Sequence, residues 1–142
     1  MLENAFSPLT DWGLLVLRLG AGVVFLAHGL LKVRSPGGAG GLAGWLKQMG
    51  VPAPGLLAWV VIVLETAGAI LLMLGLGTRI LALGFAIDML VALFLVKRKV
   101  MKVGFVGTQG TGWEMDFAML IQSVALMLMG GGRFGLDALL GL

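Results

Sequence analysis

Residues 55–76, GLLAWVVIVLETAGAILLMLGL, form one continuous apolar run whose only charged side chain is Glu65. The run is long enough to cross the hydrocarbon core of a bilayer as an α-helix, which takes about 20 residues. Three further apolar runs lie at 12–33, 80–96 and 113–129. In hydrocarbon these runs must be helices, because an open strand would leave its backbone amides without hydrogen-bond partners. The sequence therefore predicts an all-α integral membrane protein, a bundle of four transmembrane helices.

The overall composition agrees with a small membrane protein. Of its 142 residues, 59% are hydrophobic and 12% are charged, and the mean hydropathy is +1.05. Soluble domains are about 45–50% apolar. Four spans use most of the length, so residues 1–142 are expected to form a single domain. The chain has no cysteine, which excludes thiol chemistry and cysteine-ligated metal or iron–sulfur centres within it, and no metal site is expected.

The connection between the first two runs contains a short amphipathic segment. Leu42, Trp45, Leu46 and Met49 recur at helical spacing, with Lys47 among the residues of the opposite face. Such a pattern is typical of a helix lying in the membrane interface. We therefore expect an interfacial helix over Gly40–Gly50.

Lysine and arginine are distributed unequally between the two sides of the predicted bundle. One side carries only Arg79 and Arg133, and the other carries seven basic residues: Lys32, Arg34, Lys47, Lys97, Arg98, Lys99 and Lys102. The positive-inside rule then places both termini outside, in a multi-pass protein of the plasma membrane. Because these residues lie in short loops, we interpret them as topology signals, with anionic lipid as a secondary partner and no nucleic acid.

Ionisable side chains at membrane depth are the candidate functional residues. Each costs roughly 2.5–3.5 kcal/mol at the centre of a bilayer unless it is paired or faces water. The helical rise of about 1.5 Å per residue predicts two clusters. The first, near the middle of the membrane, contains Arg18, Glu65 and Asp88, and the second, near the inner face, contains His28, Lys32, Glu114 and Asp116.

These residue types suit ligand binding and proton transfer. Arg18 is expected to bind an anion or a carbonyl group and His28 to donate a hydrogen bond, with Lys32 and Asp116 beside them. Glu65 and Asp88 are the candidates for moving protons, and one of the two carboxylates would be protonated. In a purely structural alternative, Arg18 pairs with Glu65 or Asp88 to fix the helix register, and His28 donates to a backbone carbonyl.

Four motifs along the chain resemble the DoxX family of bacterial four-helix membrane proteins. They are RLGAGVVFLAHGLLKV at 18–33, ETAG at 65–68, LGLGTR at 74–79 and GGGRFGLDALL at 130–140. The resemblance runs from about residue 12 to residue 140. The matching positions are Arg18, Gly20, His28, Gly29, Lys32, Glu65, Gly68, Gly75, Arg79 and Asp137. Gly135 departs from the pattern, because members often have serine there.

The resemblance implies a place in the bacterial inner membrane, as a membrane subunit of thiosulfate:quinone oxidoreductase or of another quinone-linked oxidoreductase. Quinone would then be a cofactor that is not covalently bound. No residue of the chain carries electrons alone, so a redox partner subunit is expected beside membrane lipid and a second copy of the chain. The alternative is a non-enzymatic anchor, assembly factor or small transporter whose buried ion pairs are structural, and both hypotheses stay open at this point.

Overall fold

The computed structural model describes residues 9–107, 110 and 112–142, and every regular element within these residues is a helix. This confirms the predicted all-α class for the described part of the chain. In chain order the elements are α2 (Thr10–Arg34), α3 (Gly38–Gln48), α4 (Pro54–Val63), a π-helical turn (Leu64–Gly68), α5 (Ala69–Leu74), α6 (Thr78–Val91), a π-helical segment (Ala92–Val100), α7 (Glu114–Met129) and α8 (Leu136–Leu140).

Three of the helical stretches are long and apolar enough to cross a membrane. They are α2, the continuous helix Pro54–Leu74 formed by α4, the π-helical turn and α5, and the continuous helix Thr78–Val100 formed by α6 and the second π-helical segment. They correspond to the predicted runs at 12–33, 55–76 and 80–96. Their outward faces carry large apolar side chains, as a lipid environment requires.

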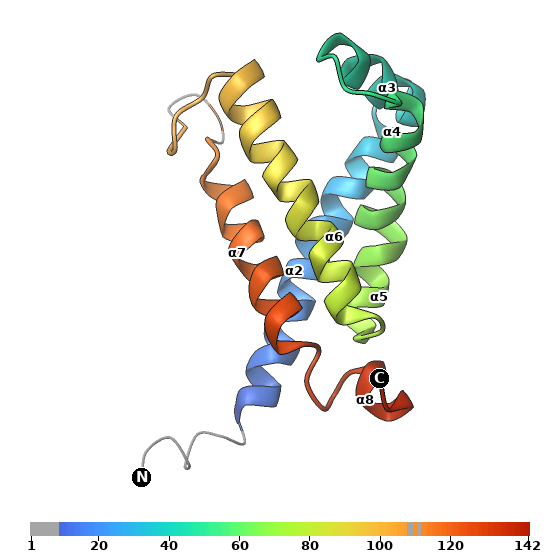
Figure 1. Cartoon of the computed structure of the whole chain (residues 1–142), viewed down its shortest axis with the longest axis vertical. Helices are drawn as coiled ribbons and strands as arrows, with labels where there is room; N and C mark the ends of the chain where they lie inside the picture. The colour runs from blue at the N-terminus through green and yellow to red at the C-terminus, as the bar shows by residue number, and fades with distance from the viewer. Residues whose placement is uncertain (1–8, 108–109, 111) are drawn as a thin grey trace.

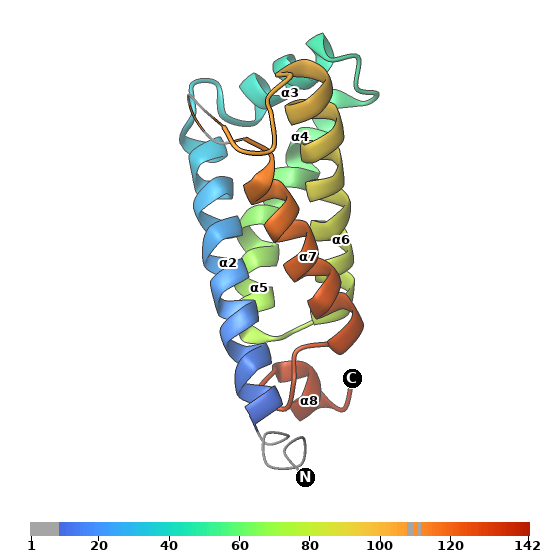
Figure 2. The ribbon, with the colours of Figure 1, turned by 90° about the vertical axis from the view of Figure 1, so that its left-hand side faces the viewer.

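The fourth apolar run forms α7, which has 16 residues. At about 1.5 Å per residue it is about 24 Å long, less than the hydrocarbon core of about 30 Å. It packs along α6 and also contacts α2, so it belongs to the same bundle (Figure 2). Whether α7 is a fourth transmembrane span stays a prediction.

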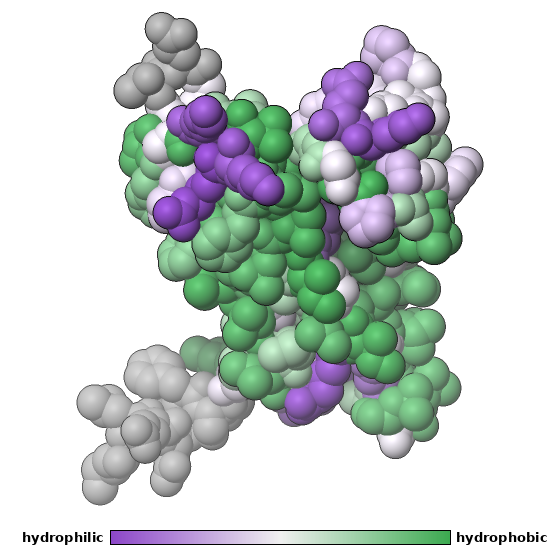
Figure 3. All heavy atoms as spheres, turned by 45° about the horizontal axis from the view of Figure 1, so that its top comes forward, coloured by the Kyte–Doolittle hydropathy of each residue, from purple (hydrophilic) through white to green (hydrophobic). Residues whose placement is uncertain are grey.

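The predicted segment between the first two spans is helical, but α3 begins and ends two residues earlier than expected. It packs on α4, at the end of the bundle opposite α8 (Figure 1). Its position in the membrane interface stays a prediction. The end at α3 is also the end that carries Lys47 and the run Lys97–Lys99, and hydrophilic side chains gather there (Figure 3). We call it the basic end, and the end at α8 the opposite end.

The core contains small residues where the helices approach most closely. Ala21, Ala69 and Ala82 are fully buried, and the rings of Phe25 and Phe85 stack with centroids 3.9 Å apart. α6 contacts the π-helical turn and α5, and toward the basic end it diverges from α3 and α4 (Figure 1).

Gly29 is where α2 approaches the second span. A β-carbon built on Gly29 would lie 2.7 Å from both the backbone carbonyl carbon and the carbonyl oxygen of Glu65. Such contacts are closer than van der Waals packing permits, and neither atom belongs to a side chain that could move aside. Only glycine therefore allows this approach.

The Gly29→Ala substitution should lower the free energy of unfolding by about 1–3 kcal/mol, because the added methyl group forces α2 away from Glu65. Gly20→Ala is the matched control, since nothing lies within 4 Å of the position that its β-carbon would take. That change should be neutral or stabilising by up to about 1 kcal/mol. Thermal unfolding in detergent compares the two variants, and equal effects would show that the close approach at Gly29 is not required.

Candidate functional site

Glu65 is the centre of a charged cluster between the first two spans. It lies on the π-helical turn and is 1% exposed, and its carboxylate forms an ion pair with the ammonium group of Lys32 on α2. The side chain of Lys32 keeps 31% exposure, so the pair lies at the margin of the core. The prediction that Arg18 is the partner of Glu65 is therefore wrong.

The local structure around Glu65 is irregular. A π-helical turn holds one more residue than an α-helical turn would, and such turns occur frequently at functional sites. Within it, the hydroxyl of Thr66 donates to the carbonyl of Ile62 at 2.6 Å. The turn faces Gly29, so the backbone of α2 and that of the second span are in direct contact where Glu65 projects. Lys32 lies one helical turn beyond Gly29 on the same face of α2, and its ammonium group is therefore within reach of the Glu65 carboxylate.

Asp88 brings a second carboxyl group to the cluster, as predicted. It lies on α6, is half-buried, and interacts electrostatically with Glu65. One oxygen, Oδ2, is buried and has no hydrogen-bond partner among the described residues. Two carboxyl groups can share a hydrogen bond only when one of them carries a proton, because a carboxylate has no donor.

A cavity of about 220 Å³ opens beside Glu65. Its polar lining comes from His28, Glu65, Lys97 and Asp116, and its apolar lining from Val24, Phe25, Met89, Met115 and Met119. His28 is exposed and Asp116 half-buried. The cavity thus brings together candidate residues from α2, the second span and α7.

Lys97 lines this cavity, although the sequence analysis counted it only as a topology signal. It is half-buried near the end of the third span, whereas its neighbours Arg98 and Lys99 are exposed. A lysine at the end of a span can direct its ammonium group along the helix. The position of Lys97 at the end of the third span could therefore have identified it as a candidate cavity residue.

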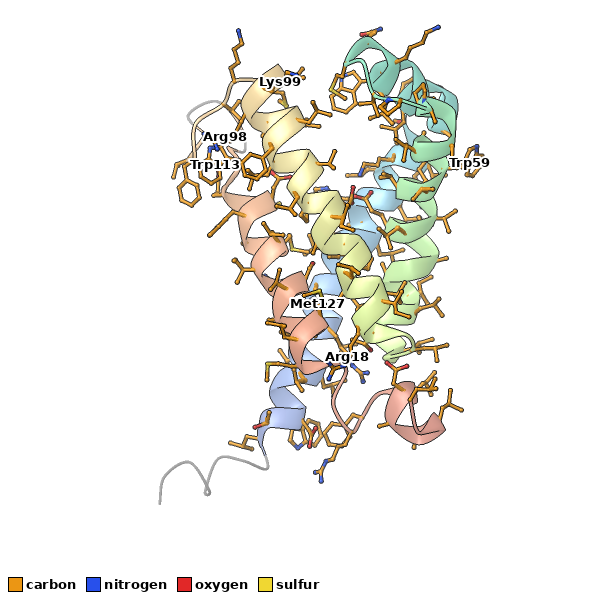
Figure 4. All side chains as sticks on the ribbon, in the orientation of Figure 1. Arg18, Trp59, Arg98, Lys99, Trp113 and Met127 are labelled. Carbon is orange, nitrogen blue, oxygen red and sulfur yellow. The ribbon has the colours of Figure 1, made fainter. Side chains whose placement is uncertain are left out.

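Arg18 lies in a different cluster, near the opposite end of the bundle (Figure 4). Its side chain is 2% exposed, and Nη2 donates to the carbonyl of Phe134 at 2.7 Å. Gly75 and Gly135 pack directly against the guanidinium group. Neither Nε nor Nη1 has a hydrogen-bond partner among the described residues. The predicted cluster of Arg18 with Glu65 and Asp88 is therefore wrong, because Arg18 holds the segment after α7.

Asp137 completes this second cluster. Its carboxylate accepts the N–H groups of Gly77 at 2.6 Å and Thr78 at 2.9 Å, where α6 begins, and its own N–H donates to the carbonyl of Gly75 at 2.8 Å. Burial raises the pKa of Asp137, but the hydrogen bonds from Thr78 and Gly77, with the nearby charge of Arg18, outweigh it, so the pKa is lowered overall. These contacts attach the segment 130–140 to the opposite end of the bundle.

The cluster at the basic end can hold and transfer protons. It combines three carboxyl groups with two lysines and one histidine, namely Glu65, Asp88, Asp116, Lys32, Lys97 and His28. In the part of the chain that the structure describes, no group of three or more His, Asp or Glu side chains has an arrangement that could hold a metal ion. The side chains of the cluster offer hydrogen bonding and acid–base transfer.

Comparison with known proteins identifies relatives that match most of the chain. A family model described as DoxX matches residues 13–98. The chain is 32% identical over 126 residues to a Bacillus subtilis protein named "Putative oxidoreductase CatD", covering 88% of this chain and 84% of that protein. It is 35% identical over 128 residues to the "Uncharacterized membrane protein Rv3486" of Mycobacterium tuberculosis, covering 85% of this chain and 77% of that protein. No solved structure matches significantly.

Replacing Glu65 by leucine should destabilise the protein, because Lys32 would lose its partner. Breaking a fully buried pair costs about 3–5 kcal/mol, and the loss here should be smaller because Lys32 is partly exposed. Lys32→Leu in the Glu65→Leu background should recover part of the loss. Unfolding of the single and double variants measures the coupling, and strictly additive effects would contradict the pairing.

Lowering the pH should detach the segment 130–140 from the opposite end. Because the pKa of Asp137 is lowered in the folded protein, its stabilisation is complete above the unfolded pKa of about 3.9 and is lost as the pH falls through the folded value. The ring of Trp12 lies 4.6 Å from that of Phe134, so tryptophan fluorescence reports the detachment. The acid-induced change should be absent in Trp12→Phe, and Asp137→Ala should show the detached signal already at neutral pH. An unchanged fluorescence in Asp137→Ala would contradict this attachment.

Proposed function

The chain belongs to the DoxX family of membrane proteins, and on that premise we propose that it is the membrane subunit of a quinone-linked oxidoreductase. In this proposal the quinone head group binds in the cavity beside Glu65. The name of the relative from Bacillus subtilis supports an oxidoreductase. The quinone and the redox partner are what the resemblance to the family implies, and the chemistry of the cavity supports the quinone.

The observation that carries the proposal is the lining of this cavity. Phe25, Met89 and Met119 offer apolar walls for a ring, while His28 and Lys97 offer hydrogen-bond donors for its carbonyl oxygens. Methionine side chains adapt to ligands of irregular shape. A carbonyl-bearing aromatic ligand is therefore a better match than a purely apolar one.

The charges of the cluster favour a neutral ligand over an anion. The cavity is lined by two carboxyl groups, Glu65 and Asp116, against one lysine, Lys97, and the nearby Lys32 is already paired with Glu65. The sequence-based alternative of a small anionic substrate is thus the weaker one, all the more because Arg18 lies outside this cavity.

The acid–base groups have a defined task in quinone chemistry. Reduction of a quinone to a quinol adds two electrons and two protons and forms two O–H bonds. The proton shared by Glu65 and Asp88 would supply one of these bonds, and a proton from the side of Asp116 would supply the other. The electrons must come from a redox partner subunit, because the side chains of this bundle store none.

We place the protein in the inner membrane with the basic end in the cytoplasm, α7 as the fourth span and α3 in the interface. The basic residues favour this orientation by the positive-inside rule. The start of α2 and the end of α8 lie at the opposite end (Figure 1), so both termini would be outside.

The second candidate function is a non-enzymatic anchor or assembly factor. It is favoured by the contacts of the two buried charges, since Arg18 binds the carbonyl of Phe134 and Glu65 pairs with Lys32. Both contacts join segments of the chain and need no ligand. In that case the cavity would be a gap between helices rather than a binding site.

Binding of a short-tailed benzoquinone to the purified protein in native lipid distinguishes the two functions. The parent chain should bind it, as measured by quenching of tryptophan fluorescence. His28→Ala should weaken binding about tenfold, the equivalent of one lost hydrogen bond. Arg79→Gln is the control, because Arg79 lies at the opposite end of the bundle, and this variant should bind the quinone like the parent. No binding by the parent, or equal binding by His28→Ala, would remove the quinone site and favour the anchor.

A further inference from the structure

The outer surface of the third span carries a feature that the cavity does not use. Where this span ends, exposed basic side chains lie beside two exposed rings, Phe94 and Phe105, and the half-buried ring of Trp113 (Figure 4). We call this surface the basic–aromatic patch, and it consists of Phe94, Arg98, Lys99, Lys102, Phe105 and Trp113.

Aromatic rings hold the guanidinium group of Arg98 in place. Its Cζ lies 5.6 Å from the ring centroid of Phe94 and 5.8 Å from that of Trp113. The ring of Phe105 packs on Trp113 at 4.5 Å, edge to face. Stacking occupies the flat sides of a guanidinium group and leaves its N–H edge available, the edge that binds phosphate oxygens in pairs.

The backbone supports this arrangement. The chain turns after the third span at Lys102, which has a φ of +53°. It then returns so that Trp113 N–H donates to Gly104 at 3.2 Å and Glu114 N–H donates to Phe105 at 3.1 Å. Gly104 and Phe105 are thus held against the start of α7, which keeps the ring of Phe105 beside that of Trp113.

The positive charge of the patch is not neutralised within the described residues. The ion pairs there are Lys32 with Glu65 and Arg133 with Asp11, and both lie elsewhere. Arg98, Lys99 and Lys102 are all exposed. A ligand with negative charge is therefore the complementary partner.

An apolar stripe leads from the patch along the span. Ile87, Val91 and Phe94 are spaced at i, i+4 and i+7 and continue to Arg98, so they share one helix face. They are 53%, 45% and 54% exposed, respectively. A free phosphate ion would use only the basic residues, whereas a phospholipid would also use this stripe for an acyl chain.

We propose that the basic–aromatic patch is a binding site for an anionic phospholipid, with the phosphate at Arg98 and an acyl chain along Ile87, Val91 and Phe94. Lys99 and Lys102 contribute attraction to the anionic head group. Trp113 lies near the end of the third span, and tryptophan is enriched at the head-group level of membranes. This site is independent of the cavity beside Glu65.

The experiment measures lipid retention by the purified full chain. The protein is reconstituted with equal amounts of phosphatidylglycerol and phosphatidylcholine that carry the same acyl chains, and the lipid retained after detergent extraction is quantified by native mass spectrometry. The parent should retain phosphatidylglycerol preferentially. Arg98→Gln and Lys99→Gln should each lower this preference about fivefold, which corresponds to about 1 kcal/mol per basic side chain near an anionic surface.

Lys47→Gln is the matched control, because Lys47 is an exposed lysine on α3 at the same end but outside the patch. It should retain the parent's preference. Replacing Val91 by serine should weaken retention of the lipid without altering the charge. Equal retention of the two lipids by the parent, an equal loss in Lys47→Gln, or displacement of the lipid by inorganic phosphate would each overturn the proposal.

Discussion

The ion pair between Lys32 and Glu65 is the interaction on which the bundle depends, because it joins the first two spans and gives the buried carboxylate of Glu65 a partner. The pair can form only if the helices are close, and Gly29 removes the β-carbon that would keep them apart. The π-helical turn then presents Glu65 toward both α2 and α6. Asp88 is thereby brought to the same carboxylate, and the cavity follows from the space left beside them.

Much of this architecture is encoded locally and could be predicted. The length of an apolar run is a property of consecutive residues, so the three long helices and α3 were located to within a few residues. The contact between Glu65 and Asp88 could be predicted as well, because both lie near the middle of their spans and hydrocarbon favours contact between polar groups. Neither inference needs the lateral order of the helices.

The partner of each charge could not be predicted, because it depends on that lateral order. Depth alone makes Arg18 as good a partner for Glu65 as Lys32 is, and only the packing of Gly29 on the π-helical turn decides between them. Arg18 instead donates one hydrogen bond, from Nη2, to the carbonyl of Phe134, which lies 116 residues further along the chain. The π-helical hydrogen-bond register also leaves no simple mark in the sequence, since residues 64–68 would be equally acceptable in an α-helix.

The distance along the chain between Arg18 and its acceptor has a consequence for biogenesis. A ribosome completes the first span long before it reaches Phe134, so the growing polypeptide must insert an arginine whose eventual acceptor does not yet exist. During synthesis the guanidinium group must be solvated by water or lipid phosphates near the membrane surface. The last step of assembly is therefore the exchange of this solvation for the carbonyl of Phe134, and truncation of the final residues would leave a bundle that is inserted but not closed.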